Sequence, residues 1–293
     1  SEKYNTMHVG DGVEAYPTRS LSRLFFISDA ISIGKRIPKP NVISVQDPFE
    51  SGLAGVFLSR ALRVPLHVQV HTDLFSKNFS SGMINRLRIV IAPFVLKRAS
   101  RIRVVSEHIK HDLQKVWKIK APISVLPIFV DTDSFADAEA PEALKERFKS
   151  FGLKFLVVSR LESEKNVALA VHAFAESAPP NSALIILGDG THREALGKLV
   201  KDLNIFDRVF FEGFVDAKGY YKLADLVLST SRYEGYGMTI VEALASGTSV
   251  LSTDVGIARE AGAIIASEDA FVDALKQWLV SGSREGKLLI ETY

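Results

Sequence analysis

Short apolar runs alternate with segments of helical periodicity along most of the chain. The segments of helical periodicity are Gly52–Leu62, Asn166–Ser177, Arg193–Leu203 and Thr239–Ala245. Runs of strand length are Asn41–Gln46, Leu66–His71, Ile102–Ser106, Ile123–Pro127, Phe155–Ser159, Ala183–Gly188, Val209–Gly213, Asp225–Thr230 and Ser249–Ser252. Such alternation predicts an α/β protein whose parallel sheets carry helices on both faces. Wholly apolar runs such as Phe155–Val158 favour strands buried on both sides.

The alternation is interrupted once, after Pro127. Turn-forming residues at Asp131–Phe135 precede an Ala/Glu/Pro-rich stretch at Ala136–Ala143, and a new strand is expected near Leu153. A chain of 293 residues is long enough for two domains. We therefore expect an N-terminal domain over residues 1–133, a linker over 134–150 and a C-terminal domain over 151–293.

Composition narrows the class of protein. The absence of cysteine excludes a disulfide framework, a zinc-thiolate site and a cysteine nucleophile, and it fits a reducing cytoplasm. The longest apolar runs have the length of strands, whereas a membrane-spanning helix needs about 20 apolar residues. The polar segment Ser1–Gly10 is unlike a signal peptide. We expect a cytoplasmic protein.

Positive charge is concentrated in one part of the first half. Residues 60–120 hold 13 Lys or Arg against 3 Asp or Glu, a net charge of +10, whereas the rest of the chain has a net charge of −8. Such a concentration predicts an anionic partner, for example a phospholipid surface, a phosphorylated acceptor or a nucleic acid. An ordinary solvated surface explains it equally well.

One segment within this basic part has an apolar stripe. In Phe79–Ala99 the apolar residues recur at helical spacing and basic residues flank them; the stripe comprises Met83, Ile84, Leu87, Val90, Ile91, Phe94 and Val95. An apolar stripe beside cations suits a helix at an anionic membrane surface. For the stripe itself we favour a helix packed on the sheet, and we expect Pro93 to bend or break it.

Two glutamates in the second half carry the strongest chemical signal. Glu234 follows the strand Asp225–Thr230, at the strand end where open α/β sheets bind ligands, and Glu242 stands eight positions later. Gly235 and Gly237 allow a tight turn and close approach to a ligand. A helix beginning near Met238 would offer free N–H groups to a phosphate or to sugar hydroxyls.

Three further loops follow predicted strands of the same half. Arg160 and Lys165 bracket the first and suit a diphosphate, although ion pairs with Glu162 and Glu164 would make it an ordinary charged loop. The others are Gly188–Arg193 and Thr253–Glu260. Since all of these loops fall on one edge of a parallel sheet, we expect a single site.

These motifs together resemble a known family. The segment from Glu234 to Glu242, with the following Ala243–Gly247, resembles the Glu-x7-Glu motif of the retaining glycosyltransferases of family 4. Arg160 with Lys165, Gly188–Gly190 and Gly256–Glu260 match the family's other donor-side motifs in order and spacing. The resemblance implies the GT-B fold, in which two Rossmann-like domains face each other across a cleft. It also implies a retaining hexosyltransferase that needs no metal and no cofactor.

The resemblance assigns roles to particular residues. Its implied catalytic residues are His71, Arg160, Lys165 and Glu234. Its implied donor-binding residues are Gly188, Asp189, Gly190, Gly235, Tyr236, Gly237, Met238, Thr239 and Glu242. Arg160 and Lys165 would hold the donor diphosphate, Glu234 the transferred sugar and Glu242 the ribose. The implied partners are a nucleotide-sugar donor and a glycan or lipid-linked acceptor, and no nucleic acid is expected. From the basic charge and the apolar stripe we separately hypothesise docking on an anionic membrane surface, at the inner face of the membrane.

Two other motifs have simpler explanations. His108 and His111 are three residues apart and have the spacing of metal ligands on a helix, but we favour exposed surface positions. Asp131-Thr132-Asp133 resembles the Asp-x-Asp metal motif of other transferases. We reject that reading because the motif falls at the domain junction, where turn formation explains the aspartates.

The first 40 residues depart from the family pattern. They do not match the opening strand and Gly-Gly loop that contribute to the acceptor side in this family, and this favours a truncated chain. The alternative function is therefore a catalytically silent nucleotide-sugar-binding or scaffold protein. A dinucleotide-dependent oxidoreductase is disfavoured because no Gly-x-Gly-x-x-Gly follows an early strand.

Overall fold

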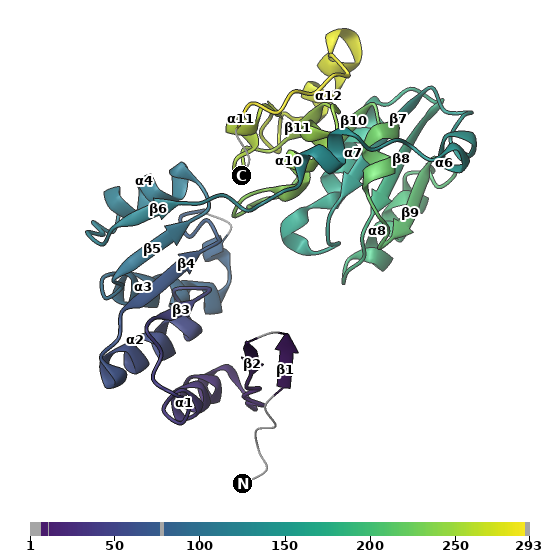
Figure 1. Cartoon of the computed structure of the whole chain (residues 1–293). Helices are drawn as coiled ribbons and strands as arrows, with labels where there is room; N and C mark the ends of the chain where they lie inside the picture. The colour runs from purple at the N-terminus through teal and green to yellow at the C-terminus, as the bar shows by residue number, and fades with distance from the viewer. Residues whose placement is uncertain (1–6, 11, 77–78, 291–293) are drawn as a thin grey trace. The chain divides into compact units, whose positions relative to one another are not determined.

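The computed structural model describes residues 7–10, 12–76 and 79–290, and the chain divides into two compact units (Figure 1). Unit 1 is Ser1–Leu126 and unit 2 is Pro127–Tyr293. The segment expected to be a linker, residues 134–150, belongs to unit 2 and contains helix α6 (Glu142–Arg147) and most of α5 (Thr132–Ala136).

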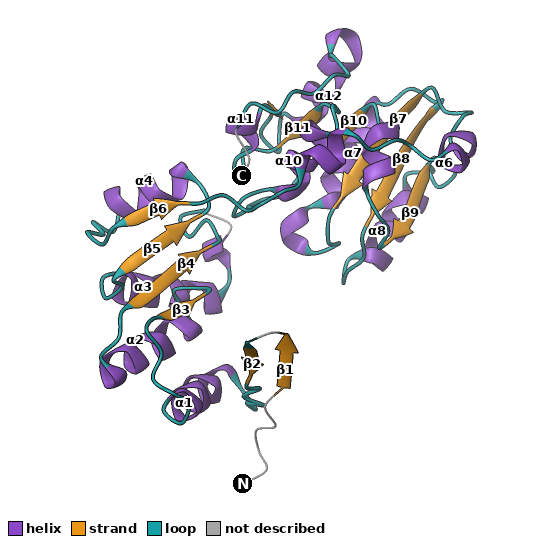
Figure 2. Cartoon of the chain, in the orientation of Figure 1, coloured by secondary structure: helices purple, strands orange, loops and turns teal. Residues whose placement is uncertain are grey.

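Unit 1 is built on a four-stranded parallel sheet of order β3-β4-β5-β6 (Figure 2). Its strands are β3 (Ile43–Val45), β4 (Leu66–Val70), β5 (Arg101–Val104) and β6 (Ile123–Val125). The helices that connect them are α2 (Glu50–Leu62), α3 (Met83–Leu96, after a 3-10 turn at Phe79–Ser81) and α4 (Glu107–Lys115). Helix α2 lies close to the sheet at Gly55, where a Cβ atom would come within 2.8 Å of Val45.

Three elements of unit 1 precede this sheet, and the hydrophobic pattern did not predict them. Strands β1 (Met7–Gly10) and β2 (Val13–Ala15) form an antiparallel pair, and helix α1 (Arg23–Gly34) follows. The Ser22 side chain caps α1 by accepting a hydrogen bond from the Phe25 N–H. Because strands this short hold too few residues to show an alternation, periodicity gives little signal for them.

Helix α3 differs from expectation at Pro93. The helix continues through Pro93 to Leu96, so the expected break is wrong. Proline removes one N–H group and disfavours the helical conformation of the residue before it. The buried residues Ala92, Val95 and Leu96 anchor this last turn against the rest of unit 1, and that packing holds the helix together.

Unit 2 is built on a six-stranded parallel sheet of order β12-β11-β10-β7-β8-β9. Its strands are β7 (Leu153–Val158), β8 (Ser182–Leu187), β9 (Val209–Gly213), β10 (Leu226–Ser229), β11 (Val250–Ser252) and β12 (Ile264–Ile265). Besides α5 and α6, its helices are α7 (Val167–Ser177), α8 (Arg193–Asp202), α9 (Lys218–Leu223), α10 (Met238–Ala245), α11 (Ala258–Ala261) and α12 (Phe271–Ser281).

Both faces of this second sheet are buried. Side chains from alternate positions, such as Phe155 and Leu184, join α7, α8 and α12 in one apolar core. The intervening residues, such as Leu156 and Ile185, are also fully buried, and α9 packs against β7 on the sheet. This double burial explains why the strands are continuous apolar runs. All nine predicted strands and all four predicted helices are confirmed, with their ends within two residues of the predicted ones.

Candidate functional site

Four loops of unit 2 meet at one edge of its sheet. They follow β11, β10, β7 and β8, which are adjacent in that order and all parallel. Their carboxyl ends therefore lie side by side, and the loops after them form one surface. These loops contain Gly256, Glu234, the Arg160–Lys165 pair and Gly188–Gly190. The fold thus brings the four sequence motifs together.

Lys165 and Glu234 form the centre of this edge. The Lys165 Nζ lies 2.5 Å from the Glu234 Oε1, although the two residues are 69 positions apart. The Ser231 hydroxyl donates to the same oxygen at 2.7 Å. Both charged side chains are largely enclosed, with 16% and 18% exposure. A cation and a carboxylate held this close can bind a ligand that bears both an anion and hydroxyl groups, such as a sugar phosphate.

Arg160 stands at the outer side of the same loop. Its guanidinium pairs with Glu164 at 3.1 Å, and its side chain is 65% exposed. Of the two ion pairs that the sequence suggested within this loop, the one with Glu164 is therefore present. Glu162 instead accepts hydrogen bonds from Thr191. An exposed ion pair of this kind contributes little free energy to stability. Breaking it to bind an incoming phosphate therefore costs little free energy.

The glycine loop after β8 packs directly on the Arg160 loop. Gly188 has φ +112°, and a Cβ atom there would lie 2.0 Å from the Ser159 carbonyl oxygen. The Leu161 N–H donates to the Asp189 carbonyl at 2.9 Å. Glu162 accepts from both the N–H and the hydroxyl of Thr191, and these hydrogen bonds lower the pKa of Glu162. The glycines are needed here because backbone meets backbone, which fixes the two loops relative to each other.

Helix α10 begins within the site. Gly237, at φ +100°, precedes the first helical residue Met238 and has no side chain to cap the helix. The first N–H groups of a helix lack acceptors within it, and they carry the positive end of the helix dipole. Gly256 lies against this turn, where a Cβ atom would come within 2.2 Å of the Tyr236 carbonyl oxygen. Met238 and Thr239 therefore present amides suited to an anionic or hydroxylated ligand.

Glu242 lies one turn into α10 and is partly buried. Its Oε2 accepts a hydrogen bond of 2.8 Å from the hydroxyl of Tyr221 on α9. Burial raises the pKa of Glu242, and the Tyr221 hydrogen bond opposes that rise. Tyr221 is fully buried, and the same desolvation with the neighbouring carboxylate raises its pKa well above the usual value. Glu242 is thus a carboxylate held by a neutral donor, with its other oxygen left for hydroxyl groups.

His71 belongs to unit 1, where it follows β4. Its Nε2 lies 3.1 Å from the Gln46 Oε1, at the end of the adjacent strand β3. Partial burial and the nearby Arg103 lower the pKa of His71. The lowered pKa favours the neutral ring, which can accept a proton.

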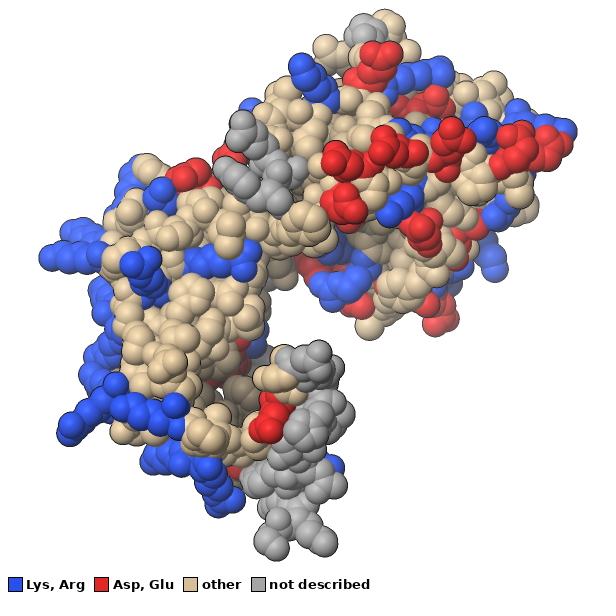
Figure 3. All heavy atoms as spheres, in the orientation of Figure 1, with Lys and Arg blue, Asp and Glu red and all other residues tan. Residues whose placement is uncertain are grey.

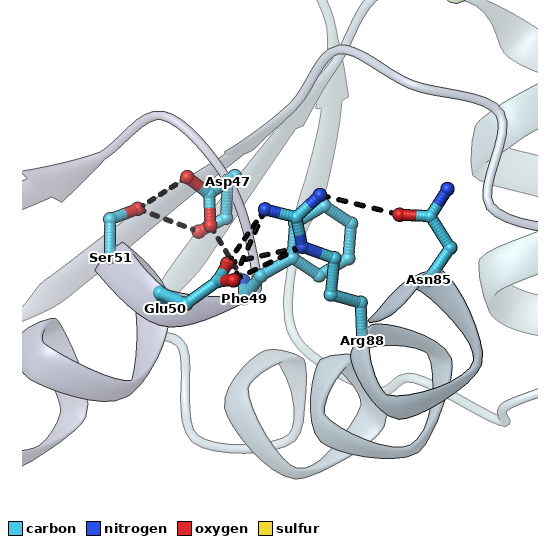
Figure 4. A network of polar contacts seen from close by, with 6 residues as sticks. All are labelled: Asp47, Phe49, Glu50, Ser51, Asn85 and Arg88. Atoms are coloured by element: carbon cyan, nitrogen blue, oxygen red, sulfur yellow. Dashed lines mark hydrogen bonds and ion pairs between the residues drawn. The ribbon is translucent and has the colours of Figure 1, made fainter. Parts of the chain in front are cut away.

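Several of the basic residues of unit 1 serve its own packing. Figure 4 shows Arg88 of α3 paired with both carboxylate oxygens of Glu50 on α2, at 3.1–3.3 Å. The Arg88 guanidinium also lies 5.0 Å from the centre of the Phe49 ring. The N–H of Phe49 in turn donates to Asp47 at 2.7 Å. Arg88 therefore fixes α3 to the start of α2, and its charge is largely neutralised by Glu50.

The apolar stripe of α3 is mostly exposed. Met83, Leu87 and Val90 expose 86%, 59% and 71% of their surface, and Ile84 and Phe94 are exposed as well. The expectation that this stripe packs against the protein is thus wrong for these five residues. It holds for Val95, which is buried with Ala92 and Leu96, and in part for the half-buried Ile91. We call Met83, Ile84, Leu87, Val90 and Phe94 the α3 stripe. Figure 3 shows Lys and Arg gathered along one side of unit 1, whereas both signs are mixed over unit 2.

The remaining candidates have structural roles. Asp131 caps α5 by accepting from the Ser134 N–H at 3.2 Å, and His108 lies 3.5 Å from Asp112 on its own helix. Over residues 7–10, 12–76 and 79–290, no group of three His, Cys, Asp or Glu side chains is arranged to hold a metal ion. In the same residues, no helix combines the length and the apolar character needed to cross a bilayer.

A small cavity lies beside the loop that holds Arg160 and Lys165. It has a volume of about 220 Å³, and its lining includes the apolar residues Leu161, Val167 and Leu196 together with His192 and Arg232. It is lined from the α7 and α8 side of the sheet, so it is separate from the position of Glu242 on α10.

The sequence reading did not identify three residues that shape these sites. Ser231 and Tyr221 contact the two glutamates, and Gln46 contacts His71. A serine in a loop and a tyrosine in a six-residue helix have no distinctive local pattern. Only the hydrogen bond that each makes in three dimensions reveals its role.

Comparison with known protein families gives two matches that together span most of the chain. A model described as "Glycosyltransferase Family 4" matches residues 3–134, and one described as "Glycosyl transferases group 1" matches residues 142–287. The chain is 30% identical over 240 residues to an alpha-monoglucosyldiacylglycerol synthase of Streptococcus pneumoniae. That match covers 77% of this chain and 54% of the relative, and the chain spans about half the length of the curated relatives it matches.

Solved structures show the same fold. A sucrose-phosphate synthase from Thermosynechococcus elongatus matches with a TM-score of 0.78 and 18% identity, over 94% of this chain and 76% of that one. The Anabaena protein HepE in complex with UDP matches with a TM-score of 0.73 and 18% identity, over 88% and 74% of the two chains. The expected GT-B fold is therefore confirmed.

Proposed function

Because the chain belongs to glycosyltransferase family 4, we propose that it transfers a sugar from a nucleotide diphosphate donor, a UDP- or GDP-sugar, to a glycan or lipid-linked acceptor. The observation that carries this proposal is the contact between Lys165 and Glu234 at the meeting point of four loops. In this proposal Lys165 is the cation for the leaving diphosphate, and Glu234 beside it is the carboxylate for the sugar, close to the uncapped start of α10. HepE, which has the same fold, has been solved in complex with UDP, and this supports a nucleotide ligand.

Lys165 and Arg160 are the residues that receive the donor diphosphate. As the bond between the anomeric carbon and the phosphate oxygen breaks, negative charge develops on the departing diphosphate. The enclosed Lys165 ammonium and the exposed Arg160 guanidinium stabilise that charge, assisted by the amides at the start of α10. Fixed groups aimed at developing charge contribute about 10²–10³ in rate per group.

Glu234 and Glu242 orient the donor in this proposal. Glu234 accepts hydrogen bonds from hydroxyls of the transferred sugar, while Ser231 and Lys165 hold its carboxylate in place. Glu242 accepts hydrogen bonds from the ribose hydroxyls through the oxygen that Tyr221 does not occupy.

The bond from the acceptor oxygen to the anomeric carbon forms on the face from which the diphosphate leaves. The acceptor proton passes to the diphosphate, so the configuration at the anomeric carbon is retained. NMR of the anomeric proton of the product tests this, since an inverted product contradicts it.

Donor binding is proposed to need no divalent metal, because Arg160 and Lys165 supply positive charge at the phosphate position. The test is the affinity for a nucleotide sugar measured with excess chelator and with magnesium. Equal affinities are expected, and a loss of more than tenfold under chelation contradicts the proposal.

The donor can be identified by thermal unfolding with UDP, GDP and their sugars. A ligand at 100 times its Kd stabilises the folded state by about 2.7 kcal/mol, so the true donor gives the largest shift. Turnover with a matched acceptor then separates a transferase from a silent nucleotide-sugar-binding protein. The absence of a shift with any nucleotide diphosphate contradicts both.

Unit 1 is proposed to dock on the anionic inner face of a cytoplasmic membrane and to take acceptors from it. The α3 stripe is exposed, and helical geometry places Arg86, Lys97 and Arg98 along its two sides. The Arg98 guanidinium covers the Phe94 ring at 3.6 Å, which keeps its charge beside the stripe. Apolar side chains between cations are the composition of an interfacial helix.

Vesicle co-sedimentation tests this docking. Binding is expected with anionic lipid, absent with neutral lipid, and weaker at physiological than at low salt. Equal binding to both lipids, or none at low salt, favours an enzyme that takes soluble acceptors. Strong salt-dependent affinity for DNA or RNA instead indicates a nucleic-acid partner.

A further inference from the structure

Helix α9 contributes two adjacent tyrosines, each of which donates to a glutamate. Tyr221 is fully buried, and its hydroxyl donates to the Glu242 Oε2 at 2.8 Å. Tyr220 is only partly buried, and its hydroxyl donates to the Glu212 Oε2 at 3.1 Å. Glu212 lies on β9 and is already held by the guanidinium of Arg147, with contacts of 2.6 and 2.7 Å. The two tyrosines share a helix and a chemistry but serve different carboxylates.

Tyr221 is fixed from several sides. The Thr248 hydroxyl donates to its backbone carbonyl at 2.7 Å, and the Phe135 ring meets the Tyr221 ring edge-on at 5.9 Å between centroids. A side chain held in this way cannot follow a moving carboxylate. Its hydroxyl is therefore a fixed donor, and Glu242 must adopt the rotamer that reaches it.

The consequence for Glu242 concerns both its orientation and its charge. A hydrogen bond from Tyr221 to Oε2 leaves Oε1 as the oxygen available to a ligand. The hydrogen bond also offsets part of the burial that raises the pKa of Glu242. Without the phenol, the Glu242 carboxylate would be free to rotate. It would also lose a hydrogen-bond donor, and this loss costs more free energy for a partly buried carboxylate than for an exposed one.

We propose that Tyr221 is a positioning residue for nucleotide binding, whose hydroxyl holds the Glu242 carboxylate in the orientation that accepts the ribose hydroxyls. This rests on the proposed function, in which Glu242 binds the ribose. Tyr221 thereby sets how strongly the site distinguishes a ribonucleotide from its 2′-deoxy counterpart, without touching the nucleotide itself.

The test compares Tyr221→Phe with Tyr220→Phe, a matched variant that removes the neighbouring hydroxyl of the same helix. Calorimetry gives the Kd values for UDP and 2′-deoxy-UDP, or for the guanine pair if GDP gives the larger thermal shift. The ratio of the Kd for 2′-deoxy-UDP to the Kd for UDP measures the preference for the ribonucleotide. This ratio is expected to fall about three- to tenfold in Tyr221→Phe and to stay unchanged in Tyr220→Phe. An unchanged ratio in Tyr221→Phe, or an equal fall in both variants, overturns the inference.

A second measurement does not depend on the nucleotide. The carboxyl carbon of Glu242, observed by NMR, is titrated in the wild type and in both variants. Tyr221→Phe is expected to move the titration to higher pH, and Tyr220→Phe to leave it in place. If Glu242 titrates identically in all three proteins, Tyr221 does not hold the carboxylate. If Tyr221→Phe moves the titration but Glu242→Ala binds the nucleotide as the wild type does, the contact with Tyr221 stands and the ribose assignment fails.

Discussion

The two units use their charged side chains in opposite ways. In unit 2, Lys165 and Glu234 lie in contact at the edge of the sheet, although 69 positions separate them, and both are largely enclosed. In unit 1, Arg88 forms an ion pair with Glu50 where helices α3 and α2 pack together, and Lys97 is exposed beside the α3 stripe. Unit 2 has the organisation of a binding site for a small anionic ligand. The exposed apolar and basic surface of unit 1 instead suits the larger partner proposed for it, an anionic membrane.

The largest expected effect is on turnover, from a change at the centre of unit 2. Lys165→Ala removes the enclosed cation, so donor hydrolysis and sugar transfer are expected to slow by about 10²–10³ while nucleotide affinity changes less. Steady-state kinetics measures both. Lys145→Ala is the control, since Lys145 is half exposed and pairs only with Glu142 among the ion pairs of the described residues. A loss below tenfold in Lys165→Ala assigns the leaving-group charge to another residue.

The next effect is on binding. Glu242→Ala removes a carboxylate that accepts ribose hydroxyls, so the nucleotide is expected to bind with about 1.5–3 kcal/mol less free energy, or about ten- to 150-fold more weakly. Isothermal calorimetry with UDP or GDP measures this. Glu142→Ala removes an 85% exposed carboxylate from the same unit and is expected to bind as the wild type does. Wild-type affinity in Glu242→Ala refutes the ribose assignment.

A pH profile sharpens the same assignment. Burial raises the pKa of Glu242, so in the folded protein this carboxylate becomes protonated at a higher pH than an ordinary glutamate. The ribose hydroxyls need an ionised acceptor, and nucleotide affinity is therefore expected to fall as the pH is lowered through that raised pKa. Glu242→Gln is expected to bind more weakly at neutral pH and to lose this part of the profile. Parallel profiles for the two proteins would mean that another group titrates.

Linkage gives the corresponding sign for stability. A carboxyl group whose pKa is raised by folding makes the folded state less stable as the pH rises through that pKa. Chemical denaturation is expected to show Glu242→Gln gaining stability relative to the wild type between acid and neutral pH. The opposite trend would show that the Tyr221 hydrogen bond outweighs the burial of Glu242.

The smallest effect tests unit 1 as a surface. Lys97→Ala removes one exposed charge beside the α3 stripe, and binding to anionic vesicles is expected to weaken by about 1 kcal/mol, roughly fivefold. Lys276→Ala removes a half-exposed lysine from α12 of unit 2 and is expected to bind as the wild type does. Equal losses in the two variants would mean that overall charge, and not the α3 surface, draws the protein to the membrane.

The sequence alone determined the α/β class, the strands β3 to β11 and the four motif-bearing loops. It could do so because strands buried on both faces must be apolar and because ligand loops follow strand ends, so both leave local patterns. Family resemblance added the roles proposed for Lys165, Glu234 and Glu242. The strands β1, β2 and β12 were missed because periodicity is weak in so few residues. Helix α1 has 12 residues, but its apolar side chains are spread around the helix instead of along one face, so it shows no amphipathic pattern.

Only the tertiary structure decided which side chains meet and which remain exposed. The contact of Lys165 with Glu234 depends on β7 and β10 being neighbours in the sheet, and strand order is not written in any single segment. The α3 stripe had the same helical spacing as a packed face, and only the positions of neighbouring elements showed that Leu87 is exposed while Leu96 is buried. Tyr221 acquires its role because α9 and α10 bring its hydroxyl to Glu242. A sequence pattern shows which positions are apolar, whereas the residues that each side chain contacts depend on how distant segments pack together.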